Sequence, residues 1–244
     1  MFFVKKIPSI IAILLLIDLG LGLAYVGHYY FVGDVSLKLT NLLDLNGERS
    51  LCMWYSSTKL FCISLLGLLY ASSKYDPKNN STYLLFGFPA IFLFLSMDET
   101  LQFHEWLAHR ADLLLPEGTR EGTIFSTTGI WMFVLGIPFA LFFAWLMYAV
   151  RGYLTESVAS LRKIAAGMAM LLLGSLGIET GANFVNHDAF EFILQVLMEE
   201  QLEMLGATVM LWGMYGLAAT SSPVGFLVQP QARSASKVRS AKHA

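Results

Sequence analysis

Charged residues are scarce in this chain. Asp, Glu, Lys and Arg make up 14% of its 244 residues, while apolar residues make up 56%. Ordinary globular chains have about 25% charged and about 45–50% apolar residues, so the composition argues against a soluble domain. The net charge of −2 and the lack of a Lys/Arg-rich patch within the apolar stretches argue against a nucleic-acid partner.

Cysteine and internal repetition are also nearly missing. The two cysteines, Cys52 and Cys62, lie ten residues apart. On one helix they would be separated by about 15 Å, which is too far for a disulfide. We therefore expect both to be apolar packing residues. The lack of an internal repeat gives no support to a transporter built from inverted repeats.

Long apolar stretches are what the chain has in abundance. A membrane-spanning helix needs about 20 such residues, and six stretches approach or exceed that length: residues 8–29, 51–72, 82–103, 129–150, 164–184 and 193–219. We therefore predict an all-α integral membrane bundle of about six transmembrane helices over residues 1–221. The Ser-, Ala- and Lys/Arg-rich residues 222–244 predict a disordered cytoplasmic tail that contacts membrane lipids.

The first apolar stretch also resembles a signal peptide. Lys5 and Lys6 precede an apolar core, and the small residues Gly22 and Ala24 follow it. However, Asp18 lies inside the core and the stretch is long for a signal peptide. We expect the segment to be retained as a membrane anchor.

The positions of Lys and Arg predict the orientation of the bundle. Eleven of the 16 lie at one set of helix ends and in the tail, four lie at the other set of ends, and Lys59 lies inside the second stretch. Because loops rich in Lys and Arg stay in the cytoplasm, both termini are predicted to be cytoplasmic. We expect a multi-pass protein of a bacterial inner membrane.

Polar residues on three predicted helices lie at similar depths. Counted from the cytoplasmic ends at 1.5 Å per residue, Asp98 lies about 24 Å, Glu179 about 22 Å and Glu203 about 24 Å into the bilayer. In an apolar core of about 30 Å, all three lie just below the outer boundary. Such residues are costly in a membrane and usually have a function.

Helical spacing groups these polar residues into stripes. The stripes are Asp98, Gln102, Glu105 and His109; Glu179, Asn183 and His187; and Glu191, Gln195, Glu199 and Glu203, with Glu200 to one side. Glu99 and His104 do not share the face of Asp98, so we do not expect all polar residues of residues 98–109 to point into one cluster. The segment is predicted to form one wall of a shared, outward-opening site.

So many carboxylates at this depth need protonation, nearby cations or a bound metal. Lys59, Arg49 and Arg110 are the candidate counter-charges, although the Lys59 side chain is equally suited to extend toward headgroups. Carboxylates with imidazoles suit Zn, Fe or Mn. The candidate metal ligands are Asp98, Glu99, His104, His109, His187 and Glu203, and the candidate acid/base groups are Glu105, Glu179 and Glu200.

Familiar metal motifs are not matched. His104 and His109 form H-E-x-x-x-H, one residue longer than the zinc-protease motif, so one helix does not present both to one ion. No histidine has Glu three residues before it, as a ferritin-like di-iron site requires. Haem ligation by His104 and His187 is disfavoured, because nothing favours axial ligation over a carboxylate partner.

Two short segments resemble those of other proteins. S-x-D-E-x-x-x-x-H-E at residues 96–105 and E-E-x-x-E-M-x-G at residues 199–206 are similar to segments of uncharacterised bacterial polytopic inner-membrane proteins. The resemblance implies the membrane class and no activity.

These observations leave three hypotheses for function. The first is metal-dependent membrane chemistry on a lipid, quinone or similar substrate, and whether the chain is an enzyme stays open. The second is a cation- or proton-coupled transporter, disfavoured because only Asp18 lies near mid-depth. The third is a non-catalytic subunit of a larger membrane complex, whose polar residues only hydrogen-bond between helices.

Overall fold

The computed structural model describes residues 7–32, 41–47, 50–126, 128–154, 157–184 and 189–220. Every regular element within these ranges is a helix, as predicted. The α-helices are α1 (Ser9–Gly27), α3 (Leu51–Lys74), α4 (Gly87–Leu101), α5 (Phe103–Ala111), α6 (Ile137–Leu154), α7 (Val158–Leu172), α8 (Glu179–Ala182) and α9 (Ala189–Ala218).

Short segments of tighter or wider helix join or extend these elements. The 3₁₀ segments are Asn80–Phe86, Asp112–Leu114 and Pro116–Gly118, and the π-helical segments are His28–Val32, Met132–Gly136 and Leu173–Ile178. The segment Leu173–Ile178 continues α7 into α8, so these three form one long helix that widens near its end. Widened turns of this kind are frequent at functional sites.

Five helices among the described residues are long and apolar enough to cross a membrane. They cover Ser9–Phe31, Leu51–Lys74, Asn80–Leu101, Met132–Leu154 and Val158–Ala182, close to the first five predicted stretches. These helices indicate a multi-pass membrane protein. The 30-residue α9 carries several carboxylates in its first half, and a sixth span there stays a prediction, as does the orientation. The predicted tail at 222–244 lies outside the described residues.

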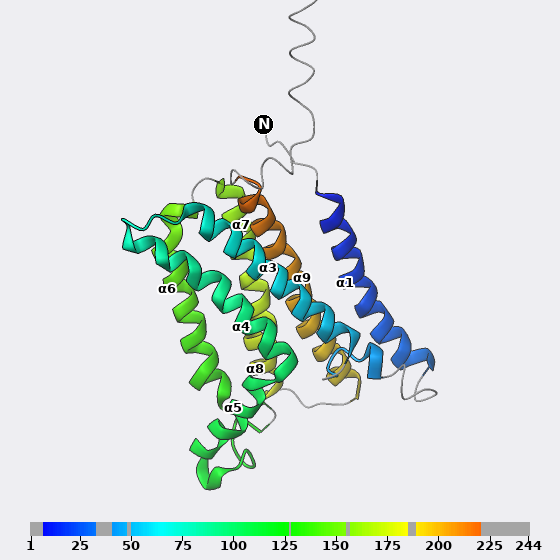
Figure 1. Ribbon diagram of the computed structural model, residues 1–244. Helices are drawn as coiled ribbons and strands as arrows, with labels where there is room; N and C mark the ends of the chain where they lie inside the picture. The colour runs from blue at the N-terminus through cyan, green and yellow to red at the C-terminus, as the bar shows by residue number, and fades with distance from the viewer. Residues whose placement is uncertain are drawn as a thin grey trace, which may run out of the picture.

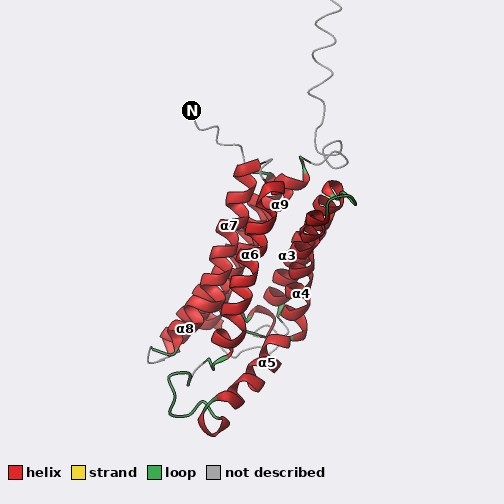
Figure 2. Cartoon of the chain, turned by 90° about the vertical axis from the view of Figure 1, so that its left-hand side faces the viewer, coloured by secondary structure: helices red, strands yellow, loops and turns green. Residues whose placement is uncertain are grey.

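Helix α9 lies inside the bundle, against α7, α3 and α1. Helix α4 packs on α3, and Figure 2 shows these two on one side of the molecule with α6 and α7 on the other. Helix α1 begins and α9 ends at the same end of the bundle, whereas α5 lies at the opposite end (Figure 1). The predicted placement of both termini in the cytoplasm stays a prediction, because residues 1–6 and 221–244 lie outside the described residues.

Glycines bring α7 and α9 close together. A Cβ on Gly206 of α9 would lie 2.6 Å from the main-chain oxygen of Gly167 in α7. Next to α7, a Cβ on Gly174 would lie 2.8 Å from the main-chain oxygen of Glu199. Close approach through small residues is a common way to pack membrane helices. It fixes the acidic half of α9 against the end of α7.

The main apolar core lies at the other end of the bundle. Phe92 of α4 is fully buried against Phe88 and Phe143, with ring centroids 4.7 and 6.0 Å away. Met210 of α9 belongs to the same cluster. The tight core at this end leaves the polar residues of α4, α5 and α9 gathered at the end where α5 lies.

A buried ion pair joins α1, α3 and α9. Lys59 Nζ lies 2.7 Å from Asp18 Oδ1 and donates to the main-chain oxygen of Met204 at 2.8 Å. The Thr208 hydroxyl donates to Asp18 Oδ2 at 2.6 Å. The Lys59 and Asp18 side chains are 3% and 0% exposed. Lys59 therefore pairs with Asp18 at the middle of α1. The expectations that it extends toward headgroups or pairs with the carboxylates of the predicted site are wrong.

Removing either partner of this pair is expected to be costly, because the other charge is then left buried alone. We expect Lys59→Met alone to lower the free energy of unfolding by about 3–5 kcal/mol. The double variant Asp18→Leu with Lys59→Met is expected to recover most of that loss, because no charge remains. Unfolding titrations in detergent micelles measure both. A double variant as unstable as the single one would contradict this account.

Candidate functional site

A half-open cavity of about 660 Å³ lies between α3, α4, α5, α7 and α9. One part of its wall is apolar and includes Leu60, Phe94, Leu95, Leu135, Phe139, Leu171 and Leu172. The other part is polar and includes Asp98, Glu99, Gln102, His104, Glu105, His109, Arg120, Glu179, Gln195, Glu199, Glu200 and Glu203. Its size falls within the range of small-molecule sites.

The cavity brings together nearly all of the site residues that the sequence predicted. Asp98, Glu99, His104, Glu105, His109, Glu179, Glu200 and Glu203 all line it. His187 lies outside the described residues. The three walls come from the predicted segments, namely the end of α4 with α5, the start of α8 and the first half of α9. The cavity lining thus contains residues of all three predicted stripes, while their role as a functional site stays a prediction.

One expectation, about which side chains share the helix face of Asp98, was wrong. In a continuous helix through residue 109, Glu99 and His104 would not share the face of Asp98. Instead α4 ends at Leu101 and α5 begins at Phe103, because Gln102 adopts the left-handed conformation with φ 55° and ψ 40°. This break changes the helical phase of His104 relative to Asp98, and both residues line the cavity. Glu99 lies next to Asp98 in α4, before the break, and also lines the cavity. A left-handed residue other than glycine is strained and often marks a functional site.

The break at Gln102 lets Asp98 bind His104 through both carboxylate oxygens. Asp98 Oδ1 accepts from the main-chain N–H of His104 at 2.8 Å, and Oδ2 lies 2.8 Å from the ring Nδ1. The carboxylate therefore caps the start of α5, where the helix dipole favours a negative charge. The Asp98 and His104 side chains are 13% and 39% exposed.

A tryptophan connects this pair to the α8 wall. The His104 and Trp131 rings lie 5.8 Å apart between centroids, and Trp131 Nε1 donates to Glu179 Oε1 at 3.2 Å. Trp131 directly precedes the π-helical segment Met132–Gly136, which leads into α6. Its place beside His104 could not be read from periodicity, because it lies in the segment that precedes α6.

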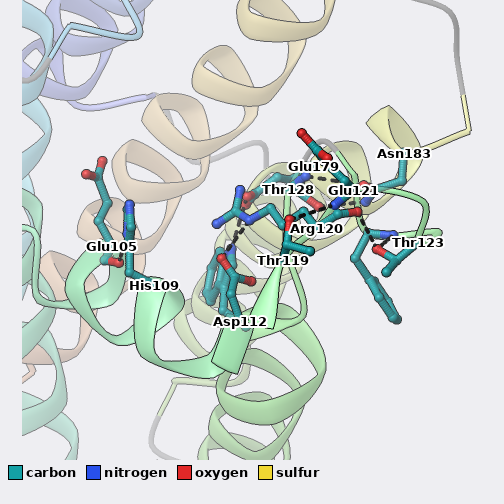
Figure 3. A network of polar contacts seen from close by, with 12 residues as sticks. Glu105, His109, Asp112, Thr119, Arg120, Glu121, Thr123, Thr128, Glu179 and Asn183 are labelled. Carbon is teal, nitrogen blue, oxygen red and sulfur yellow. Dashed lines mark hydrogen bonds and ion pairs between the residues drawn. The ribbon is translucent and has the colours of Figure 1, made fainter. Parts of the chain in front are cut away.

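An arginine that the sequence analysis did not select also lines the cavity. Arg120 Nε donates to Asp112 Oδ2 at 2.6 Å, and Figure 3 shows this pair between Glu105 and His109 on one side and Glu179 on the other. The counter-charge predicted for Arg110 is instead provided by Arg120. Arg110 lies over the Trp106 ring at 5.4 Å, and Arg49 is outside the described residues. Arg120 lies in a loop, where helical periodicity cannot predict which way a side chain points.

Gly129 makes this pair possible. Its φ of 82° suits glycine, and a Cβ there would lie 2.7 Å from Asp112 Oδ1 and 2.9 Å from the Arg120 guanidinium carbon. Beyond it, Asn183 donates to the Thr128 hydroxyl at 2.6 Å and accepts from the Thr128 N–H at 3.2 Å (Figure 3). Asn183 therefore holds the loop and does not line the cavity.

His109 has a different partner from His104. Its Nδ1 lies 2.8 Å from the main-chain oxygen of Glu105, one turn earlier in α5. The Glu105 carboxylate accepts from the Gln102 amide at 3.3 Å. The two histidines of the H-E-x-x-x-H segment thus have separate hydrogen-bond partners.

No preformed metal centre is found among the described residues, where no three His, Cys, Asp or Glu side chains are grouped to hold an ion. Both oxygens of Asp98 are engaged by His104. The remaining carboxylates of the cavity wall are those of Glu99, Glu105, Glu179, Glu199, Glu200 and Glu203. Their chemistry suits a divalent cation or a positively charged group.

The cavity wall is strongly acidic. Seven carboxylates line it, those of Asp98, Glu99, Glu105, Glu179, Glu199, Glu200 and Glu203, and among the described lining residues Arg120 is the one Lys or Arg. Lys59 pairs with Asp18 and so does not neutralise these carboxylates. Their negative charge must therefore be compensated by protonation, by the histidines or by a bound cation.

The pKa of His104 is raised above its usual value. Burial by itself lowers it, but the hydrogen bond to Asp98 and the charges of Asp98, Glu105 and Glu99 outweigh that effect. Charge on His104 therefore stabilises the fold. This contribution is fully present below the unfolded pKa of about 6.5, and it is lost as the pH rises through the higher folded pKa.

Asp98→Asn is expected to lower the pKa of His104 and to flatten this part of the pH dependence of stability. An NMR titration of the His104 ring and unfolding titrations at several pH values measure both effects. Asp112→Asn serves as control, since the partner of Asp112 is Arg120 and the pKa of His104 should not change. A wild-type pKa at or below the ordinary value would contradict the prediction.

Comparison with known proteins identifies a family but no characterised relative. No curated protein matches the chain, and no solved structure matches it. The family described as Domain of unknown function (DUF8692) matches residues 10–219, which contain all the described elements from α3 to α9 and nearly all of α1. The chain therefore belongs to the DUF8692 family.

Proposed function

We propose that this protein binds an amphiphilic, membrane-accessible substrate in the cavity and performs chemistry on it with carboxylate and imidazole groups. The observation that carries the proposal is the two-sided wall of the cavity. Leu60, Phe94 and Phe139 line it together with Asp98, His104 and Glu203. A lipid-like or quinone-like molecule has the matching division into an apolar body and a polar head.

The position of the cavity supports access from the membrane. It lies between helices that are apolar enough to span a bilayer, and its polar wall lies toward the end where α5 is found. In the proposed topology this end faces outward. The substrate would place its head among the carboxylates and its apolar part along α4 and α7.

A divalent metal ion is part of this proposal. Zn, Fe or Mn would be held by the free carboxylates of the α9 wall, chiefly Glu200 and Glu203, with Glu99 or Glu179 from the facing helices. Such an ion would polarise a bound carbonyl or activate water. The chemistry of the donor set supports this, while the described side chains would have to draw together around the ion.

We expect freshly purified wild-type protein to contain a stoichiometric metal, and Glu203→Gln to lose most of it, because Glu203 lines the cavity. Elemental analysis by mass spectrometry measures the content. Glu191→Gln is the matched control on the same helix, because Glu191 is exposed and does not line the cavity. If the freshly purified wild-type protein contains no metal, the metal ion is not part of the mechanism. Acid/base chemistry by the carboxylate and imidazole groups would then remain as the proposal.

Blocking the cavity is expected to abolish substrate binding. Ser175 is a small residue of the cavity wall, and Ser175→Phe would fill part of the space. We expect amphiphiles that stay bound to the wild type through purification to be lost from this variant. Native mass spectrometry in detergent detects them. Leu173→Phe is the matched control, because Leu173 lies two residues away and is 53% exposed. Equal retention in both variants would refute binding in the cavity.

Transport and a subunit role stay alternative predictions. The acid at mid-depth, Asp18, is already paired with Lys59 and Thr208. A transport cycle through Asp18 would therefore have to break this pair. Cation uptake into proteoliposomes by the Asp18→Leu, Lys59→Met double variant distinguishes the two routes. If uptake persists in this variant, transport does not depend on Asp18 and would have to pass through the cavity.

A further inference from the structure

We propose that His104 is the proton acceptor of the cavity and that Asp98 is its positioning residue. This inference rests on the proposed function, because it assigns roles within the same cavity. It also changes the roles expected from sequence, in which Asp98 and His104 were both candidate metal ligands. The basis is the two-point contact of the Asp98 carboxylate with one residue, His104.

The contact determines which ring nitrogen carries the proton. A carboxylate only accepts hydrogen bonds, so the Nδ1 atom 2.8 Å from Asp98 Oδ2 must be the N–H donor. In the neutral ring the lone pair then lies on Nε2, on the other side of the ring from Asp98. Because His104 lines the cavity, Nε2 is the nitrogen that a bound head group can reach.

The orientation of the ring is fixed from several directions. The main-chain N–H of His104 is bound to Asp98 Oδ1 at 2.8 Å, which ties the start of α5 to the end of α4. The Trp131 ring lies 5.8 Å from the His104 ring and is itself held by Glu179. A base supported by a second residue in this way is pre-oriented for proton transfer.

The proton-transfer step follows from this geometry. Nε2 accepts the proton of a substrate hydroxyl or of a water molecule as that oxygen bonds to an electrophilic atom of the head group, and the bond from that atom to its leaving group breaks. The resulting imidazolium keeps its Nδ1–H on Asp98, whose negative charge stabilises it. Nε2 then returns the proton to the group that leaves, so the site ends in its starting state. His109 is not equivalent, because its Nδ1 faces a neutral main-chain oxygen.

The variant Asp98→Asn tests the assignment while keeping the cap on α5. An asparagine oxygen can still accept from the His104 main-chain N–H, but its amide would donate to Nδ1 and force the proton onto Nε2. ¹⁵N NMR of the full-length protein in detergent micelles, at a pH where His104 is neutral, identifies the tautomer. We expect Nδ1–H in the wild type and Nε2–H in the variant.

Modification by diethyl pyrocarbonate, at a pH where His104 is neutral in both proteins, gives a second readout, namely whether the Nε2 lone pair is open to the cavity. The reagent attacks a nitrogen lone pair, so we expect the rate at His104 to fall about tenfold in Asp98→Asn, about the factor that one net hydrogen bond is worth. His109 in the same sample is the internal control, and its rate should stay unchanged. Peptide mass spectrometry measures both rates.

A wild-type His104 with its proton on Nε2, or an unchanged rate ratio between His104 and His109, would overturn the proposal. Neither measurement uses a substrate. Loss of amphiphile binding in the Ser175→Phe experiment tests the proposed function separately. The two proposals can therefore fail independently.

Discussion

Polar side chains inside an apolar helix bundle need partners from the protein itself, because lipid provides none. This constraint governs two parts of the molecule in different ways. At mid-depth, Asp18, Lys59 and Thr208 satisfy one another and exclude solvent. Toward the α5 end, carboxylates line an open volume of about 660 Å³. The first arrangement is complete without a ligand, whereas the second leaves acidic groups facing space.

The Asp18–Lys59 pair helps to fix the helices that surround the cavity. The ion pair ties α1 to α3 and α9, and the amide of Gln201 donates to the main-chain oxygen of Asp18 at 3.0 Å. Gly206 and Gly174 bring α9 against α7 and its extension. With one face of α9 fixed in this way, the carboxylates of Glu199 and Glu203 remain on the cavity wall.

Within the cavity, the strained residue Gln102 separates two kinds of carboxylate. By ending α4 and starting α5, it turns His104 back onto Asp98 and engages both oxygens of that carboxylate. The α9 glutamates of the cavity wall, Glu199, Glu200 and Glu203, are groups of a type suited to a cation. In the proposed function, a base oriented by Asp98 and a cation-binding wall on α9 would be complementary parts of one site.

Apolar length and helical spacing determined much of this from sequence alone. Five apolar spans and the meeting of three polar segments at one cavity follow from 1.5 Å of rise and 3.6 residues per turn, which hold wherever a helix is regular. The shared depth of Asp98, Glu179 and Glu203 stays a prediction. Where regularity ends, the tertiary structure decided. The break at Gln102, the Arg120–Asp112 pair in a loop and the choice of Asp18 as partner of Lys59 depend on contacts between segments far apart in the chain. Periodicity describes one helix at a time, and so it cannot determine which helices meet or how a loop returns to them.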